Sequence, residues 1–273
     1  LGIAGCIITA GCDLSAGRMI GFGACISGML LQRMDYSGKF FPDMQPLNVF
    51  VVALIAMLVC AAFGTVTGFF IAYLNVPPFI ATLAMMEIVY GIGLIVTNAT
   101  PLGGYVEQYT NVSNGKFLGI NYLIWIAIIV AAITWFIFNM TRHGKYMYAI
   151  GGNPQAAEVA GVPVKATLIL IYMKAAAMYG LAGFMLGAKA GGASVQTGYG
   201  YEMEAIAACT IGGVSVTGGR GKVSSAIIGV AVFELLKVAL QYLGMNANAQ
   251  YIAIGVVIFI AISLDIRKYI ARK

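Results

Sequence analysis

Charged side chains are scarce in this chain of 273 residues, with 16 lysines and arginines and 10 aspartates and glutamates. Between Met44 and Met86 there is no charged residue at all. A charge-free run of that length exceeds any core element of a soluble domain, so a soluble fold is excluded. Crossing a hydrocarbon layer of about 30 Å takes roughly 20 apolar residues, and several stretches qualify. The sequence therefore predicts an all-α polytopic membrane protein in a lipid bilayer.

Histidine is nearly absent, since His143 is the single one, and the five cysteines lie in or beside apolar segments without metal-site spacing. Such cysteines are typical of small core residues. We find no pairing of a nucleophile with a base, so we predict no enzymatic reaction, no metal and no cofactor bound by this chain. The net charge of +6 gathers in loops, which indicates topology rather than a nucleic-acid partner.

Apolar segments follow one another along the whole chain. The second and seventh of them are short and interrupted by glycine, which is typical of helices broken within a membrane. The first begins without a methionine and is too short to span, so we expect that a natural N-terminal segment precedes it. The expected spans are Leu1–Cys12, Met19–Leu31, Leu47–Leu74, Phe79–Thr97, Leu118–Asn139, Thr167–Ala188, Ala205–Val216, Val223–Leu243 and Tyr251–Leu264.

The distribution of lysine and arginine predicts the orientation of the chain. Basic residues gather in the loop 141–166, in the turn that contains Arg220 and Lys222, and in the tail after 266, including Arg272 and Lys273. The positive-inside rule places these segments on the cytoplasmic side. Segments 33–46, 98–117 and 189–204, which are neutral or acidic, are then expected to face outward.

An internal repeat predicts two related halves. Residues 11–18 (GCDLSAGR) match residues 213–220 (GVSVTGGR) at a constant offset of 202. Six expected spans lie between the two copies, and an even number makes the repeat parallel. Transporters often contain such repeats, with the pathway between them, and we assign 1–99 and 167–266 as the halves. The alternative is a chance similarity between two glycine-rich membrane turns.

The stretch 141–166 is the longest polar interruption of the chain, and its centre carries consistent helix signals. Asn153 is a good N-cap and Pro154 suits the first helical position. Gly161 can adopt the left-handed conformation that ends a helix, and Pro163 blocks continuation. The apolar side of this short helix is small, formed by Ala156, Ala157 and Ala160. It is either a contact for a soluble partner or a helix packed on its own membrane domain.

Ionisable residues within apolar spans are costly and are candidate functional sites. Glu234 and Lys237 are three positions apart, so they share a helix face and are predicted to form a structural ion pair. Glu87 and Lys174 either face a polar cavity or pair with each other.

Polar residues at span ends and helix breaks supply further candidates. We favour a structural role for Asp13, as the cap of a half-helix, over substrate contact. Amide, hydroxyl and aromatic groups of the kind found in sugar sites occur at Asn75, Thr82, Tyr90, Asn98 and Gln241. Our candidates for the pathway or for helix breaks are Asp13, Ser15, Asn75, Thr82, Glu87 and Ser215.

Four motifs carry a family resemblance. Residues 10–18 (AGCDLSAGR) resemble the G-x-D-L-S-x-G signature of bacterial ABC-type monosaccharide permeases, which import ribose, xylose, arabinose and galactose. Residues 149–162 (AIGGNPQAAEVAGV) are similar to the cytoplasmic segment of that family, and 207–219 to its third motif. Residues 71–83 also fit. The resemblance covers the whole chain, and residues 13–18 with the tail 264–269 favour the galactose/methyl galactoside branch.

This resemblance implies a type II ABC importer fold over 1–273 and a permease homodimer in the bacterial plasma membrane. It implies a cytoplasmic ABC ATPase that binds ATP-Mg, and an extracytoplasmic sugar-binding protein. It assigns 153–161 as a coupling helix, and the residues expected to couple to the ATPase are Gly151, Gly152, Asn153, Pro154, Ala156, Ala157 and Gly161. The alternatives are a permease for another monosaccharide, such as ribose or xylose, or an ATP-independent secondary transporter.

Overall fold

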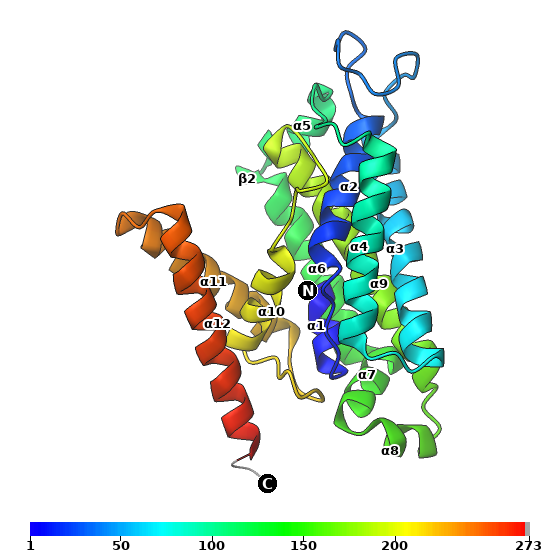
Figure 1. The fold of residues 1–273 in the computed structure, drawn as a ribbon, viewed down its shortest axis with the longest axis vertical. Coiled ribbons are helices and arrows are strands. Elements are labelled where there is room, and N and C mark those ends of the chain that lie inside the picture. Colours follow the sequence, from blue (N-terminus) through cyan, green and yellow to red (C-terminus); the bar gives the residue numbers. More distant parts are fainter. Residues whose placement is uncertain (271–273) are drawn as a thin grey trace.

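The computed structural model describes residues 1–270, so Arg272 and Lys273 of the basic tail lie outside the described residues. α-Helices form most of the described chain (Figure 1). In chain order the elements are α1 (Gly2–Ile8), α2 (Ala16–Leu30), α3 (Val49–Tyr73), α4 (Pro78–Thr97), α5 (Glu107–Asn114), β1 (Lys116–Phe117), β2 (Ile120–Asn121), α6 (Tyr122–Met140), α7 (Arg142–Gly152), α8 (Pro154–Val159), α9 (Val164–Ala190), α10 (Tyr201–Ile211), α11 (Val223–Tyr242) and α12 (Ala247–Ile270).

Five helices of the described part are long and apolar enough to cross a membrane: α3, α4, α6, α9 and α11. The prediction of an all-α polytopic membrane protein is therefore confirmed. Each expected span overlaps one helix, and the bounds differ by up to six residues, since α12 reaches Ile270 rather than Leu264. One of the differences lies before α6. There a short hairpin of β1 and β2 occupies 116–121, and α6 begins only after Asn121, whose side chain accepts a hydrogen bond from the Leu123 N–H at 2.8 Å.

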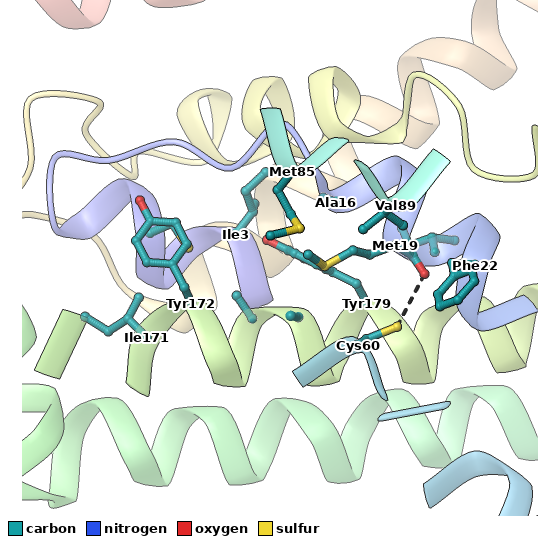
Figure 2. Packing of buried hydrophobic residues seen from close by; sticks show 14 of the residues in the cluster. Ile3, Ala16, Met19, Phe22, Cys60, Met85, Val89, Ile171, Tyr172 and Tyr179 are labelled. Carbon is teal, nitrogen blue, oxygen red and sulfur yellow. Dashed lines mark hydrogen bonds between the residues drawn. The ribbon is translucent and has the colours of Figure 1, made fainter. Parts of the chain in front are cut away.

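Helix α9 lies at the centre of the fold and packs against α3, α2 and α1 (Figure 1). Glycines make these close approaches possible: a Cβ on Gly64 of α3 would overlap the Tyr172 carbonyl oxygen, and one on Gly183 of α9 the Ile20 carbonyl oxygen. Small residues at such crossings let helix backbones pack closely in lipid. Figure 2 shows the buried hydrophobic cluster that includes Tyr172 and Tyr179.

The chain reverses direction between α1 and α2. Helix α1 is antiparallel to α9, because Gly2 lies against Tyr179 and Gly5 against Ile171. Helix α2 then runs back alongside α9 in the opposite sense to α1 (Figure 1). The first break, expected to interrupt a helix, is thus a turn of residues 9–15 that joins two short antiparallel helices.

Helices α10 and α11 form a second hairpin. Gly212, after α10, lies against the Ser225 carbonyl of α11, and Gly229 of α11 lies against the Ala208 carbonyl of α10. This pairing identifies the two helices as antiparallel and their crossing as nearly backbone to backbone. The turn of residues 212–222 between them is the second copy of the repeat.

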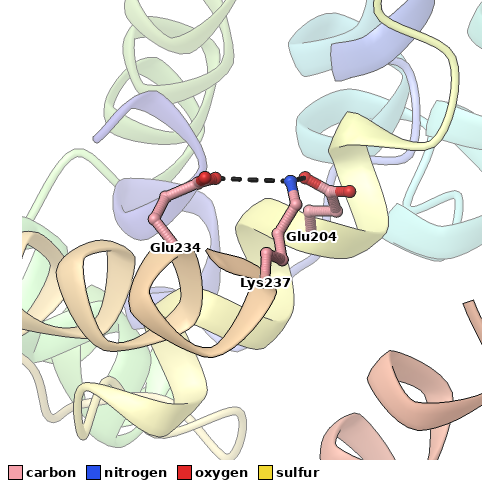
Figure 3. A network of polar contacts seen from close by, with 3 residues as sticks. All are labelled: Glu204, Glu234 and Lys237. Carbon is pink, nitrogen blue, oxygen red and sulfur yellow. Dashed lines mark hydrogen bonds and ion pairs between the residues drawn. The ribbon is translucent and has the colours of Figure 1, made fainter. Parts of the chain in front are cut away.

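An ion-pair network also joins α10 to α11. Lys237 Nζ lies 2.9 Å from Glu204 Oε2 and 3.4 Å from Glu234 Oε1 (Figure 3). The predicted pair of Glu234 with Lys237 is therefore confirmed, and Glu204 is an additional, closer partner. Glu204 and Glu202 belong to the first turn of α10. The assignment of 189–204 as an outward-facing acidic loop is wrong at its end, because helix α10 already begins at Tyr201.

Helices α7 and α8 lie together at one end of the molecule, with the 212–222 turn beside them, whereas α5 and the loop before α3 lie at the other (Figure 1). We call the first the coupling end. The basic segments 141–166 and 220–222 share it, as the predicted orientation requires.

Candidate functional site

Helix α8 forms through the local signals identified in its sequence. The Asn153 side chain accepts a hydrogen bond from the Ala156 N–H at 2.9 Å, and Pro154 is the first helical residue. After the helix Gly161 adopts a left-handed φ of +81°, which suits glycine because it has no Cβ. Pro163 then precedes the first residue of α9. The predicted cap, start and end of this helix are confirmed.

The exposed side of α8 differs from the expected alanine face. Ala157 is buried at 5% exposure and anchors the helix on its own chain, whereas Ala156 and Ala160 are exposed. Val159 is the apolar side chain most open to solvent here, at 91% exposure. The methyl group of Ala157 is therefore covered by its own chain, which agrees with the expectation of a helix packed on its own membrane domain, and its coupling to the ATPase stays a prediction.

Gly151, at the end of α7, is the point where three segments meet. It is buried, and a Cβ there would overlap the Ile8 carbonyl oxygen and lie 2.5 Å from the Gly219 nitrogen. The Gly219 N–H in turn donates a hydrogen bond of 2.8 Å to the Ile8 carbonyl. The ends of α1 and α7 and the 212–222 turn are thus joined backbone to backbone. We call Ile8, Gly151 and Gly219 the three-way junction.

Side chains reinforce the coupling end. The Tyr148 hydroxyl donates to the Gly221 carbonyl at 2.8 Å, which ties α7 to the 212–222 turn. His143 and Lys174 line a small cavity of about 30 Å³ between α7 and α9. Burial lowers the pKa of His143 to about 4, and the nearby Lys174 charge acts in the same direction. A neutral imidazole is therefore expected at physiological pH.

Asp13 and Ser15 lie together in the turn before α2. Both are buried, and Asp13 Oδ1 accepts hydrogen bonds from the Ser15 backbone N–H at 3.0 Å and from its hydroxyl at 2.5 Å. Ser15 is the N-cap residue of α2. Asp13 thus orders the start of α2 by bonding its cap residue, which is close to the structural role predicted for it.

The other pathway candidates are dispersed. Asn75 lies exposed in the α3–α4 turn with a left-handed φ of +53°, which indicates a turn role. Thr82 is fully buried and donates to the Pro78 carbonyl of its own helix at 2.9 Å. Ser215 bonds Thr217 at 2.9 Å in the 212–222 turn. Glu87 is exposed on α4, so these candidates do not converge on one site.

A polar cluster that we did not assign from the sequence lies where α2, α4 and the segment before α10 meet. It contains Arg18, Tyr90, Gln196 and Tyr199, with Arg18 over both tyrosine rings. Tyr90 appeared among the sugar-type groups, but Arg18 was noted only as part of a motif. The sequence feature that could have identified Arg18 as a site residue is its position in the first turn of an apolar helix, where a charge needs a partner.

Known proteins resemble this chain along its whole length. The galactose/methyl galactoside import permease protein MglC of Escherichia coli K12 is 41% identical across 100% of this chain and 83% of its own length. The protein of that name in Treponema pallidum is 37% identical over 100% of this chain and 54% of its own length. The ribose import permease protein RbsC of E. coli K12 is 32% identical over 96% of this chain and 79% of its length. No solved structure matches.

The family model described as "branched-chain amino acid transport system / permease component" matches residues 1–262. Together with the five apolar helices of the described part, this identifies a multi-pass protein of the inner membrane. The importer-type arrangement of its halves stays a prediction. The chain belongs to this family of transport permeases.

Proposed function

We propose that this chain is the membrane-spanning permease subunit of an ATP-driven monosaccharide importer, with galactose or methyl galactoside as its substrate. The observation that carries the proposal is 41% identity over the whole chain to permeases named for these sugars, against 32% for a ribose permease. The family description names branched-chain amino acids. We give the relatives more weight, because a family model groups permeases with different substrates.

The proposed assembly is a permease homodimer with two cytoplasmic ABC ATPase subunits and an extracytoplasmic sugar-binding protein. ATP-Mg is assigned to the ATPase, and this chain supplies no catalytic group. The coupling end supports this arrangement, because α8 presents Val159 and two alanines to solvent beside basic loops. A small apolar tip of this kind fits a groove on a soluble partner.

In the proposed mechanism ATP-driven closure of the ATPase displaces α8. The displacement reaches α6 and α9 through the connections on either side of α7 and α8. It also reaches α1 and the α10–α11 turn through the three-way junction. There Gly151 contacts Ile8 and Gly219 directly through the backbone, and Gly151 has no flexible side chain that could absorb the movement. Helix α1 and the α10–α11 hairpin would then tilt together and alternate the access of a central pathway.

Reconstituted transport tests the proposal. Proteoliposomes would contain the full-length permease with its ATPase, with the binding protein outside and ATP inside or omitted, and a panel of labelled sugars. Uptake that needs both ATP and the binding protein is expected, with galactose or methyl galactoside preferred. Uptake driven by an ion gradient without either component would overturn the proposal in favour of a secondary transporter using Glu87 or Glu234.

The docking of α8 has its own test. Val159→Asp places a charge at the exposed tip without touching the core, so the permease is expected to fold normally but to lose co-purification with the ATPase. Met34→Asp, at an exposed position of the opposite end, is the matched control and should retain it. Equal retention of the ATPase by both variants would contradict the assignment of α8.

A further inference from the structure

An irregular segment lies at membrane depth beside α2. Residues 191–200 leave the end of α9 and run along α2, where a Cβ on Gly21 would overlap the Thr197 carbonyl and one on Gly17 would lie 2.5 Å from the Gly198 carbonyl. Helix α2 is itself packed along the spanning helix α9. Non-helical backbone at this depth is tolerated only where protein buries it or where it lines a water-filled cavity.

Arg18 joins this segment to two helices. Its guanidinium carbon lies 4.1 Å from the ring centroid of Tyr90 on α4 and 4.7 Å from that of Tyr199. Its Nη1 donates to Gln196 Oε1 at 2.8 Å and to the Val195 carbonyl at 3.3 Å. The Gln196 amide donates in turn to the Tyr90 hydroxyl at 2.9 Å. The cluster is therefore connected by charge, ring and amide contacts.

The hydrogen-bonding capacity of this cluster is not exhausted. Arg18 Nε and Glu202 Oε2 are buried and have no hydrogen-bond partner among the described residues. Glu202 is 6% exposed and lies directly against Gly17, next to Arg18 in sequence. Unsatisfied buried polar atoms are costly, and in native proteins they often mark a functional site. Arg18 therefore has donor capacity beyond what its fold uses.

The adjoining face of α4 is also polar. Glu87 lies three residues before Tyr90, so the two share a helix face, and Glu87 is exposed in the middle of a spanning helix. A carboxylate in that position is too costly to face lipid and is expected to face water. The irregular segment, Arg18 and Glu87 thus indicate independently the same water-facing side.

We propose that Arg18, Tyr90, Gln196 and Tyr199 form a monosaccharide-recognition site on the wall of the translocation pathway. This inference rests on the proposed function and adds the substrate-contacting residues to it. Guanidinium, amide and phenol groups complement sugar hydroxyls, and the Tyr199 ring, 65% exposed, offers an apolar face for sugar C–H groups. Glu87 and Glu202 on the same side disfavour an anionic substrate and the Arg18 guanidinium disfavours a cationic one, which favours a neutral monosaccharide.

Substrate protection of a single cysteine tests this site directly. Gln196→Cys would be placed in a permease with Cys12→Ser, because the other native cysteines are buried, and reconstituted with the ATPase. Galactose at high millimolar concentration is expected to slow its reaction with a thiol reagent several-fold, and sorbitol is not. Asp43→Cys, exposed in the loop before α3, is the control and should react equally with and without sugar. Equal rates at Gln196→Cys would overturn the proposal.

Transport assays of variants at Tyr199 and Arg18 distinguish a role in sugar recognition from a role in stability. Tyr199→Ala and Arg18→Lys are expected to change the relative uptake of galactose and other hexoses, because lysine lacks the planar donor fork of arginine. Tyr199→Phe keeps the ring and should retain the wild-type preference. An equal loss of uptake for every sugar would identify a structural role and overturn the site. Failure of the wild type to transport any sugar would instead refute the proposed function.

Discussion

The two copies of the repeated motif form turns between oppositely directed helices but differ in their surroundings. Helices α10 and α11 pack against each other, whereas α1 and α2 each pack on α9. In the first, Asp13 and Ser15 are buried and Arg18 enters α2 to contact two tyrosine rings. In the second, the equivalent of Arg18 is Arg220, which stays exposed at the coupling end. The second turn also contains glycines with positive φ, including Gly218 at +84° and Gly219 at +70°.

This difference shows how one sequence pattern supports two roles. Side chains carry the polar contacts of the first copy, whereas the second is built for close backbone contact with Ile8 and Gly151. Positive φ is a conformation that glycine adopts without strain, so the second turn can follow the contour of α7. We therefore assign the first copy to the proposed sugar site and the second copy to the proposed transmission of the α8 displacement to the membrane helices.

The largest expected effect comes from filling the three-way junction. Gly151→Ala puts a methyl group onto the Ile8 carbonyl, and because backbone atoms surround it, overpacking of about 1–3 kcal/mol or more is expected. Gly152→Ala is the matched control, since its Cβ meets nothing within 4 Å. The midpoint of thermal unfolding of the purified permease should fall for Gly151→Ala alone. Similar behaviour of the two variants would refute the junction.

A second pair of variants compares how α2 and α11 pack against their neighbours. Gly229→Ala on α11 would overlap the Ala208 carbonyl of α10, whereas Gly17→Ala on α2 meets the Glu202 carboxylate of α10 as its nearest obstacle. A side chain can move and a helix backbone cannot, although the Gly198 carbonyl limits Gly17→Ala as well. We therefore expect the midpoint of thermal unfolding to fall further for Gly229→Ala. The reverse order would show that α2 is packed more tightly at Gly17 than α11 is at Gly229.

Local signals were enough to predict the elements but not their contacts. Cap and end residues predicted α8, and hydropathy predicted the spanning helices, because both depend on neighbours in sequence. The residues around Asp13 were predicted to interrupt a helix, but they form a turn between oppositely directed helices, because the local sequence gives no information on chain direction. Arg18 and Gln196 are 178 positions apart, so only the fold brings them together. The half-repeats 1–99 and 167–266 stay a prediction.

A smaller effect is expected when the tyrosine hydroxyl that contacts each turn is removed. Tyr148 donates to the Gly221 carbonyl at 2.8 Å in the second copy, and Tyr172 to the Cys12 carbonyl at 3.4 Å in the first. A hydrogen bond is typically worth about 0.5–1.5 kcal/mol and weakens as it lengthens. Tyr148→Phe should therefore lower the midpoint of thermal unfolding more than Tyr172→Phe. A larger loss for Tyr172→Phe would indicate that the first turn depends on its hydroxyl contact more than its length suggests.

The last prediction concerns pH and distinguishes the coupling end from the pathway side, because the single histidine, His143, lies at the coupling end. Burial lowers its pKa from 6.5 to about 4, with Lys174 acting in the same direction. Between these values the unfolded chain binds a proton that the folded chain does not, so stability is lost as pH falls from 6.5 towards 4. The unfolding temperature should drop by a few degrees over this range. His143→Gln, which cannot be protonated, should weaken that dependence, and an unchanged pH profile would show that His143 is not the titrating group.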